Sequence, residues 1–88
     1  MTVDARTSVP IPNVAEAFSV LMQHIEDHDV ELERLSSSHA RFTREGCDFD
    51  FRHDGTALTV RLRAPNENML YFLREAVAAQ ISDIDLAA

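Results

Sequence analysis

The stretch HARFTREGCDFDFRHDGTALTVRLRA, residues 39–64, decides the fold of this chain. Apolar and polar residues alternate along most of it, which is the period of a β-strand with one buried face. Glu45-Gly46 and Asp54-Gly55 interrupt the alternation, and such pairs are typical of two-residue hairpin turns. The stretch therefore predicts three consecutive antiparallel strands.

Two-residue turns also determine which residues lie opposite one another. The later turn pairs Phe51 with Leu58 and Phe49 with Val60, and the earlier turn pairs Phe42 with Phe49. Apolar residues then meet on one face and charged residues on the other, as stable cross-strand pairing requires. One face of the sheet is therefore expected to cover a core, and the other to meet solvent.

The flanking segments predict one further strand and two helices. Residues 3–9 alternate between apolar and polar, which indicates a first strand. Residues 14–28 and 67–82 carry apolar residues at helical spacing. Asn13 and Asn66 precede these two segments and are suitable N-caps. A short tail follows the second helix.

The order of elements predicts an α+β domain. Residues 30–64 hold four strands, because a three-residue serine loop at 36–38 pairs Glu33 with Arg41. The order is then β-α-β-β-β-β-α: a two-layer sandwich with a five-stranded, mainly antiparallel sheet and both helices on one face. With the first strand beside the last, the strand order 1-5-4-3-2 resembles one half-repeat of the TATA-binding-protein fold.

Composition narrows the classes of function. The 88 residues suffice for a single domain over 1–88, with an ordered core over about 3–82. The formal net charge of −7 argues against a nucleic-acid partner, and no apolar run is long enough to span a membrane. The single cysteine, Cys47, excludes an internal disulfide. No signal peptide is visible, and a single unpaired cysteine then indicates a protein of the reducing cytoplasm.

The solvent-facing side of the sheet is expected to carry four acids and four arginines. In one interpretation these groups pair with each other, and each exposed pair contributes only about 0.2–1 kcal/mol. In another, the face docks a partner or a polar ligand, with Arg61 and Arg63 available to bind a carboxylate or phosphate. The candidate ligand or partner residues here are Arg41, Arg52, Arg61 and Arg63.

Tyr71 and Phe72 occupy successive positions in the second helix, so at most one can point fully inward. We expect Phe72 to point inward and Tyr71 to lie at the margin, where it could serve a homodimer contact. An edge strand of the sheet offers unpaired hydrogen-bonding groups and could also join two copies.

His24 and His28 are four residues apart at the end of the first predicted helix. Imidazoles at this spacing can chelate a transition metal, with a neighbouring carboxylate as a further ligand. The alternative is that His28 continues the apolar stripe of Leu21 and Ile25 and lies in the last helical turn, where a partly positive imidazole is favourable. Among the other reactive groups, Cys47 is expected to be buried, and His39 and His53 to be exposed.

The chain resembles the DUF2218 family over roughly residues 4–84. The resemblance rests on the first helix ending in LMQHIEDH, residues 21–28, on Gly46-Cys47, on DGTALTVRLRA, residues 54–64, and on the final amphipathic helix. Members of that family occur alone or appended to siderophore-interacting ferric reductases, which implies a setting in iron–siderophore handling. The family usually spaces its two histidines as HFxH, one residue closer than His24 and His28, and has a histidine near the end of the last helix where this chain has QISDID, residues 80–85.

Three functions follow as hypotheses. The first is a non-enzymatic accessory module in the cytoplasm that acts as a homodimer or with a protein partner. The second is a metal-binding or metal-sensing domain that uses His24 and His28. The third is a small enzyme with a pocket between the helices and the sheet. No catalytic residue and no cofactor is predicted.

Overall fold

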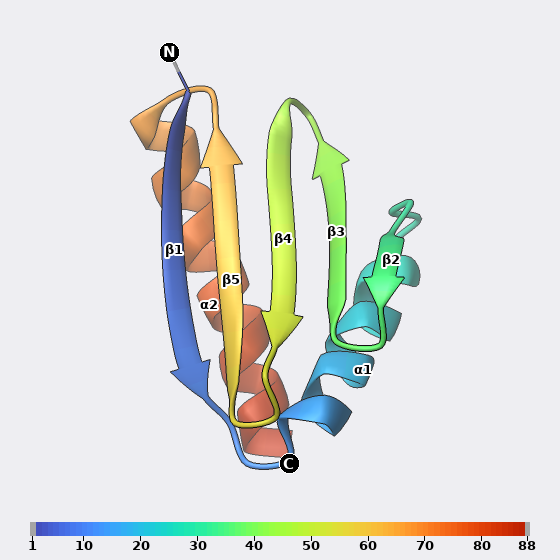
Figure 1. The fold of residues 1–88 in the computed structure, drawn as a ribbon. Helices are drawn as coiled ribbons and strands as arrows, with labels where there is room; N and C mark the ends of the chain where they lie inside the picture. Colours follow the sequence, from blue (N-terminus) through green and yellow to red (C-terminus); the bar gives the residue numbers. More distant parts are fainter. Residues whose placement is uncertain (1, 88) are drawn as a thin grey trace.

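The computed structural model describes residues 2–87 of the protein, with side chains through Ser82. Five antiparallel strands form one sheet in the order β1-β5-β4-β3-β2, and both helices lie on one face of it, as predicted (Figure 1). The elements are β1 (Val3–Pro10), α1 (Val14–Glu26), β2 (Glu33–Ser36), β3 (His39–Arg44), β4 (Cys47–His53), β5 (Ala57–Ala64) and α2 (Glu67–Ala87).

The β3–β4 hairpin has the predicted register. Phe42 lies opposite Phe49, and their rings stack with centroids 4.4 Å apart. Glu45 and Gly46 both have positive φ, 53° and 77°. This is the geometry of a type I′ turn, whose twist matches that of the two strands it joins.

The predicted register of the β4–β5 hairpin is wrong by two residues. Phe51 lies opposite Val60, not Leu58, and Phe49 lies opposite Leu62. The two central residues of the turn are Gly55 and Thr56 instead of Asp54 and Gly55. The two-residue shift leaves every side chain on its predicted face, because strand side chains alternate with period two.

The side chain of Asp54 explains where this turn falls. Its carboxylate accepts hydrogen bonds from the backbone N–H groups of Thr56 and Ala57, both at 2.9 Å, and from the Thr56 hydroxyl at 2.8 Å. These bonds favour the ionised carboxylate and lower the pKa of Asp54 to about 2. Gly55, with φ of 91°, takes the one position that needs a left-handed backbone.

The serine loop is one residue shorter than predicted. Glu33 pairs with Arg41 as expected, but Ser36 pairs with His39, so only two serines lie between β2 and β3. The register shifts between Arg34 and Ser36. Leu35 is the extra residue of this bulge, and its side chain is exposed.

The caps of the helices differ from one another. Asn66 caps α2, since its Oδ1 accepts the N–H of Met69 at 2.8 Å. Asn13 makes no side-chain capping bond and instead has a left-handed backbone, with φ of 55°. The first helix ends at Glu26, two residues earlier than predicted, and Asp29, with φ of 59°, lies in the turn that follows.

The core lies between the sheet and the two helices. Cys47 is buried, as predicted. The buried hydrophobic residues are Ile11, Val14, Ala17, Phe18, Leu21, Met22, Ala40, Cys47, Phe51, Leu58, Val60, Leu62, Ala64 and Ile81. Five of them come from α1 and, among the described side chains, one comes from α2, so α1 is the more deeply embedded helix.

Helix α2 departs from expectation in two ways. It continues through Ala87, five residues beyond the predicted end. The prediction that Phe72 points inward is wrong, because its side chain is 66 % exposed. Leu70, Leu73 and Val77 pack against the core at helical spacing, and Phe72 lies off that stripe. Within residues 2–87, no helix is both long and apolar enough to cross a membrane.

Candidate functional site

The uncovered face of the sheet carries charged side chains in register across the strands. Glu33 lies opposite Arg41, Arg41 opposite Asp50, and Asp50 opposite Arg61. By this register the face holds the arginines Arg6, Arg41, Arg52, Arg61 and Arg63 and the acids Asp4, Glu33, Asp48 and Asp50. Five of the eight arginines of an acidic chain are therefore gathered on one face.

Three of the four candidate arginines already have acidic partners. Arg41 Nε donates to Glu33 at 3.0 Å, which raises the pKa of Arg41 above its ordinary value. Arg52 Nη2 lies 3.4 Å from Asp50 Oδ1, and Arg61 Nη2 donates a hydrogen bond to Asp4 Oδ2 of β1 at 2.9 Å. Arg61 is thus paired within the chain, whereas the prediction had it free. Only Arg63 of the four has no ion pair among the described side chains.

The two histidines that were expected to be exposed are both half-buried, so this prediction is wrong. His39 Nε2 lies 2.8 Å from Asp50 Oδ2. His53 packs its ring against Phe18, with centroids 5.0 Å apart, and its Nδ1 accepts the N–H of Gly55 at 3.2 Å. His39 begins β3 and His53 ends β4, and both side chains complete the local structure there.

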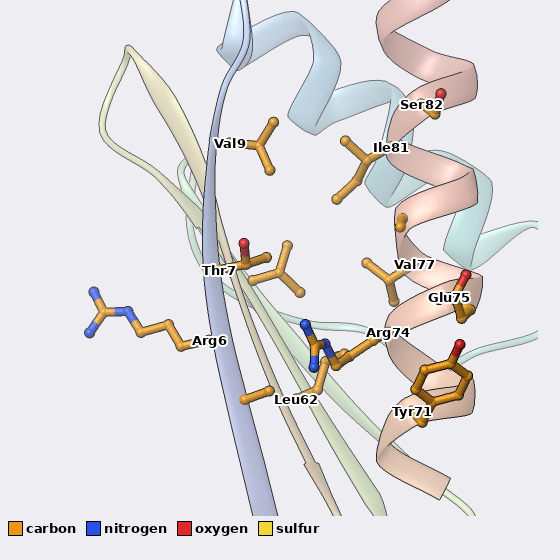
Figure 2. Close-up of a pocket in the computed structure, with 13 residues that line it drawn as sticks. Arg6, Thr7, Val9, Leu62, Tyr71, Arg74, Glu75, Val77, Ile81 and Ser82 are labelled. Carbon is orange, nitrogen blue, oxygen red and sulfur yellow. The ribbon is translucent and has the colours of Figure 1, made fainter. Parts of the chain in front are cut away.

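A groove of about 780 Å³ opens between the sheet and α2 beside the edge strand β1 (Figure 2). Tyr71 lies on its α2 side, as its 67 % exposure allows, and Arg74 reaches from the same helix toward β1. The walls are mainly apolar and are formed by Ala5, Val9, Val60, Leu62, Val77, Ala78 and Ile81, with Thr7, Glu75 and Ser82 adding polar groups. None of these lining residues is a histidine or a cysteine.

Strand β1 is at the edge of the sheet, so one of its two hydrogen-bonding edges pairs with β5 and the other is open. Ile11, just after β1, donates its N–H to Thr56 of the opposite segment at 3.3 Å. Antiparallel bonding alternates along a strand, so the odd-numbered residues of β1 bond to β5. The N–H groups of Asp4, Arg6 and Ser8 therefore point to the open edge.

Arg6, the arginine nearest this edge, lacks an acidic partner among the described side chains. Arg6 lies directly opposite Arg61 in the β1–β5 register. Like charges at directly opposed positions destabilise a strand pair. Arg61 is compensated by Asp4, whereas Arg6 has no ion pair among the described side chains. Figure 2 shows Arg6 extending away from the groove, on the other face of β1.

The predicted metal ligands lie together, but the set is incomplete. The rings of His24 and His28 meet edge to face, with centroids 4.5 Å apart. His28 lies in the turn after α1, not in the helix as expected. Among the described residues, no three side chains of the His, Cys, Asp and Glu types form a group that could hold a metal ion.

Sequence comparisons leave the family open. No family model matches the chain, and no curated protein matches it either. The NMR structure of PA4090 from Pseudomonas aeruginosa has a similar fold, with a TM-score of 0.74 over 92 % of this chain and 82 % of that one. The two chains are 16 % identical, so the likeness shows the fold alone. The resemblance to the DUF2218 family stays a prediction.

Sequence reasoning singled out Tyr71 and raised a pocket between the helices and the sheet, but it did not place the two together. The alternation of residues 3–9 put Ala5, Thr7 and Val9 on one side of the first strand. These side chains are short, which was the available sign that they would leave space between β1 and α2. The width of the gap depends on how α2 lies over β1 and β5, which the pattern of one chain does not specify.

Proposed function

We propose that this protein is a non-enzymatic accessory module that works as a homodimer joined through β1. The observation that carries the proposal is the combination of an open, eight-residue edge strand and an adjoining groove with apolar walls. Such an edge is a template for strand addition. A second copy supplies a matching edge, so a two-fold pairing of β1 strands closes both edges at once.

Charge selects the register of this pairing. In an antiparallel β1–β1 pair centred on Ala5, Asp4 of one copy lies opposite Arg6 of the second copy, and the reverse holds by symmetry. Arg6, which has only Arg61 opposite it within its own chain, then gains an acidic neighbour. Centring the pair on Arg6 instead would oppose two arginines, so Ala5 is the favoured centre.

The same arrangement extends the contact beyond the backbone. The covered faces of the two sheets become continuous, and each groove then borders the second copy. Tyr71, Arg74 and Glu75 line the α2 side of this groove. A large exposed aromatic ring with a polar tip is well suited to such a contact.

The setting of the proposed dimer comes from the DUF2218 resemblance. Members of that family stand alone or are appended to siderophore-interacting ferric reductases, so we assign the module to iron–siderophore handling beside such a reductase. The uncovered sheet face, with its five arginines, is the surface that a protein partner would meet in this setting. The proposed dimer through β1 leaves that face accessible.

The dimer is tested by sedimentation equilibrium of the wild-type chain and of variants at position 6. Arg6→Pro removes an N–H that points to the open edge without removing a bond to β5, and Arg6→Glu places an acid opposite Asp4 of the second copy. Both variants should be monomeric at concentrations where the wild type is dimeric. Arg6→Ala, which keeps the N–H and adds no charge, should weaken the dimer less.

A charge exchange supplies the matched control. The double variant Asp4→Arg, Arg6→Asp reverses both charges, so it restores opposite-charge pairs across the two-fold axis and should recover the dimer lost in Arg6→Glu. Far-UV circular dichroism establishes that each variant is folded. A monomeric wild type, or dimers that ignore all changes at position 6, would contradict the proposal.

A further inference from the structure

A second cavity lies between the end of α1, the β3–β4 hairpin and α2, away from β1. Its volume is about 200 Å³, and Phe42, Phe49 and Phe51 form its aromatic wall. Phe42 and Phe49 stack with their planes only 8° apart, and the ring of Phe42 lies 6.1 Å from that of Phe51. An apolar cavity of about 150 Å³ is large enough to bind benzene. This cavity therefore has room for one aromatic ring with a small substituent.

The rest of the lining is mainly aliphatic, and its few polar groups are basic or neutral. His24, His28, Arg44 and Gln80 contribute nitrogen-bearing groups, and none of the described lining residues is an aspartate or glutamate. A cavity lining with basic groups and no acidic ones is unusual in a chain with a net charge of −7. Basic groups beside an apolar wall favour a ligand that combines a negative charge with a flat hydrophobic body.

Arg44 is the group best placed to bind that charge. Its side chain is exposed, and it shares the covered side of β3 with Ala40 and Phe42 because alternate strand residues face the same way. Arg34, Arg41, Arg52 and Arg61 each have an acidic partner, whereas no ion pair of Arg44 occurs among the described side chains. A guanidinium binds a carboxylate through two parallel hydrogen bonds.

We propose that this cavity binds a small aromatic carboxylate of the benzoate class. The ring lies against the Phe42–Phe49 stack, and the carboxylate meets Arg44, with the imidazoles of His24 and His28 as further donors. The two histidines of the predicted metal site thus have a different role, one that needs no third metal ligand. This site does not depend on the proposed association through β1, so either can fail without the other.

The test is a titration of the ¹⁵N-labelled protein followed by two-dimensional NMR at constant ionic strength. Sodium benzoate should give saturable shifts, with a Kd of about 1 mM or tighter, at backbone amides near His24, His28 and Arg44. Benzyl alcohol has the ring without the charge, and sodium acetate has the charge without the ring. Each should bind at least about tenfold more weakly than benzoate, because it satisfies only half of the site.

Two arginine variants locate the charge contact. Arg44→Ala should weaken benzoate binding by at least about tenfold, and Arg63→Ala, on the opposite face of the sheet, should leave it unchanged. Arg44→Gln replaces Arg44→Ala if the spectrum of the latter shows loss of fold. The proposal is overturned if benzoate gives no saturable shift, if acetate reproduces the benzoate shifts, or if the two arginine variants bind benzoate equally.

Discussion

Replacing Phe51 by alanine should cost far more stability than the same replacement at Phe72. Phe51 is 2 % exposed, in the middle of the sheet between Ala40 and Val60, whereas Phe72 is 66 % exposed on α2. Truncating a buried phenylalanine to alanine typically costs about 3–5 kcal/mol. A surface replacement usually changes stability by no more than about 0.5 kcal/mol.

These magnitudes are large for a chain of this length. At about 0.05–0.15 kcal/mol per residue, the free energy of unfolding of 88 residues is roughly 4–13 kcal/mol. Phe51→Ala therefore removes a large share of it, or all of it. Phe51→Leu keeps most of the volume and should cost less than about 1.5 kcal/mol, so it provides a measurable second variant.

The assay is urea unfolding followed by far-UV circular dichroism. With a denaturant slope of about 1–3 kcal/mol/M for a small protein, Phe51→Ala should lower the urea midpoint by at least about 1 M. Phe72→Ala should move it by less than half of that. Equal shifts for the two variants, or a larger shift for Phe72→Ala, would refute the placement of these rings and with it the position of α2 on the sheet.

Three further predictions concern the turn and the reactive groups. The pKa of Asp54 is lowered from 3.8 to about 2 in the folded state, so its carboxylate stabilises the fold above about pH 4, and this contribution is lost as the pH falls through about 2. The free energies of urea unfolding of the wild type and of Asp54→Ala should therefore differ at pH 5 and converge near pH 2. A difference that does not depend on pH would contradict this prediction. Gly55→Ala should destabilise by about 1 kcal/mol or more, since φ is 91° and no atom lies within 4 Å of the added Cβ, so the cost is in the backbone and would show as a lower melting temperature. Cys47, 2 % exposed, should react with an aromatic disulfide reagent only at the rate of unfolding, and rapid labelling of the native protein would show that the thiol is accessible.

The sheet was largely predictable from the sequence because alternation and turn chemistry are local. Glu45-Gly46 could be recognised as a turn, and it set the β3–β4 register directly. Asp54-Gly55 was recognised as well, but the hydrogen bonds that the Asp54 carboxylate accepts from Thr56 and Ala57 favour a turn one residue further along the chain. The register then shifts by two residues. Alternation of apolar and polar residues cannot reveal such a shift, because it leaves each side chain on the same face of the sheet.

The helices and the sites were harder to predict because they depend on packing between distant segments. The apolar stripe of α2 is broad enough to allow several rotations, and the one observed leaves Phe72 in solvent. The ion pair of Arg61 with Asp4 joins residues 57 positions apart. It could be predicted only with a register for β1, and residues 3–9 contain no turn that fixes one.

Disulfide trapping at Ala5 tests the proposed dimer most directly. Ala5 lies on the two-fold axis of the β1–β1 pair, and its N–H bonds toward β5, so the two copies of residue 5 form a non-hydrogen-bonded pair with Cα atoms about 4.5 Å apart. That separation is within the range that a disulfide spans, roughly 4.4–6.8 Å. In a Cys47→Ala background, Ala5→Cys should form a covalent dimer on mild oxidation, and Ser8→Cys should do so much more slowly. An Ala5→Cys chain that stays monomeric, or a Ser8→Cys chain that cross-links equally fast, would contradict the association through β1.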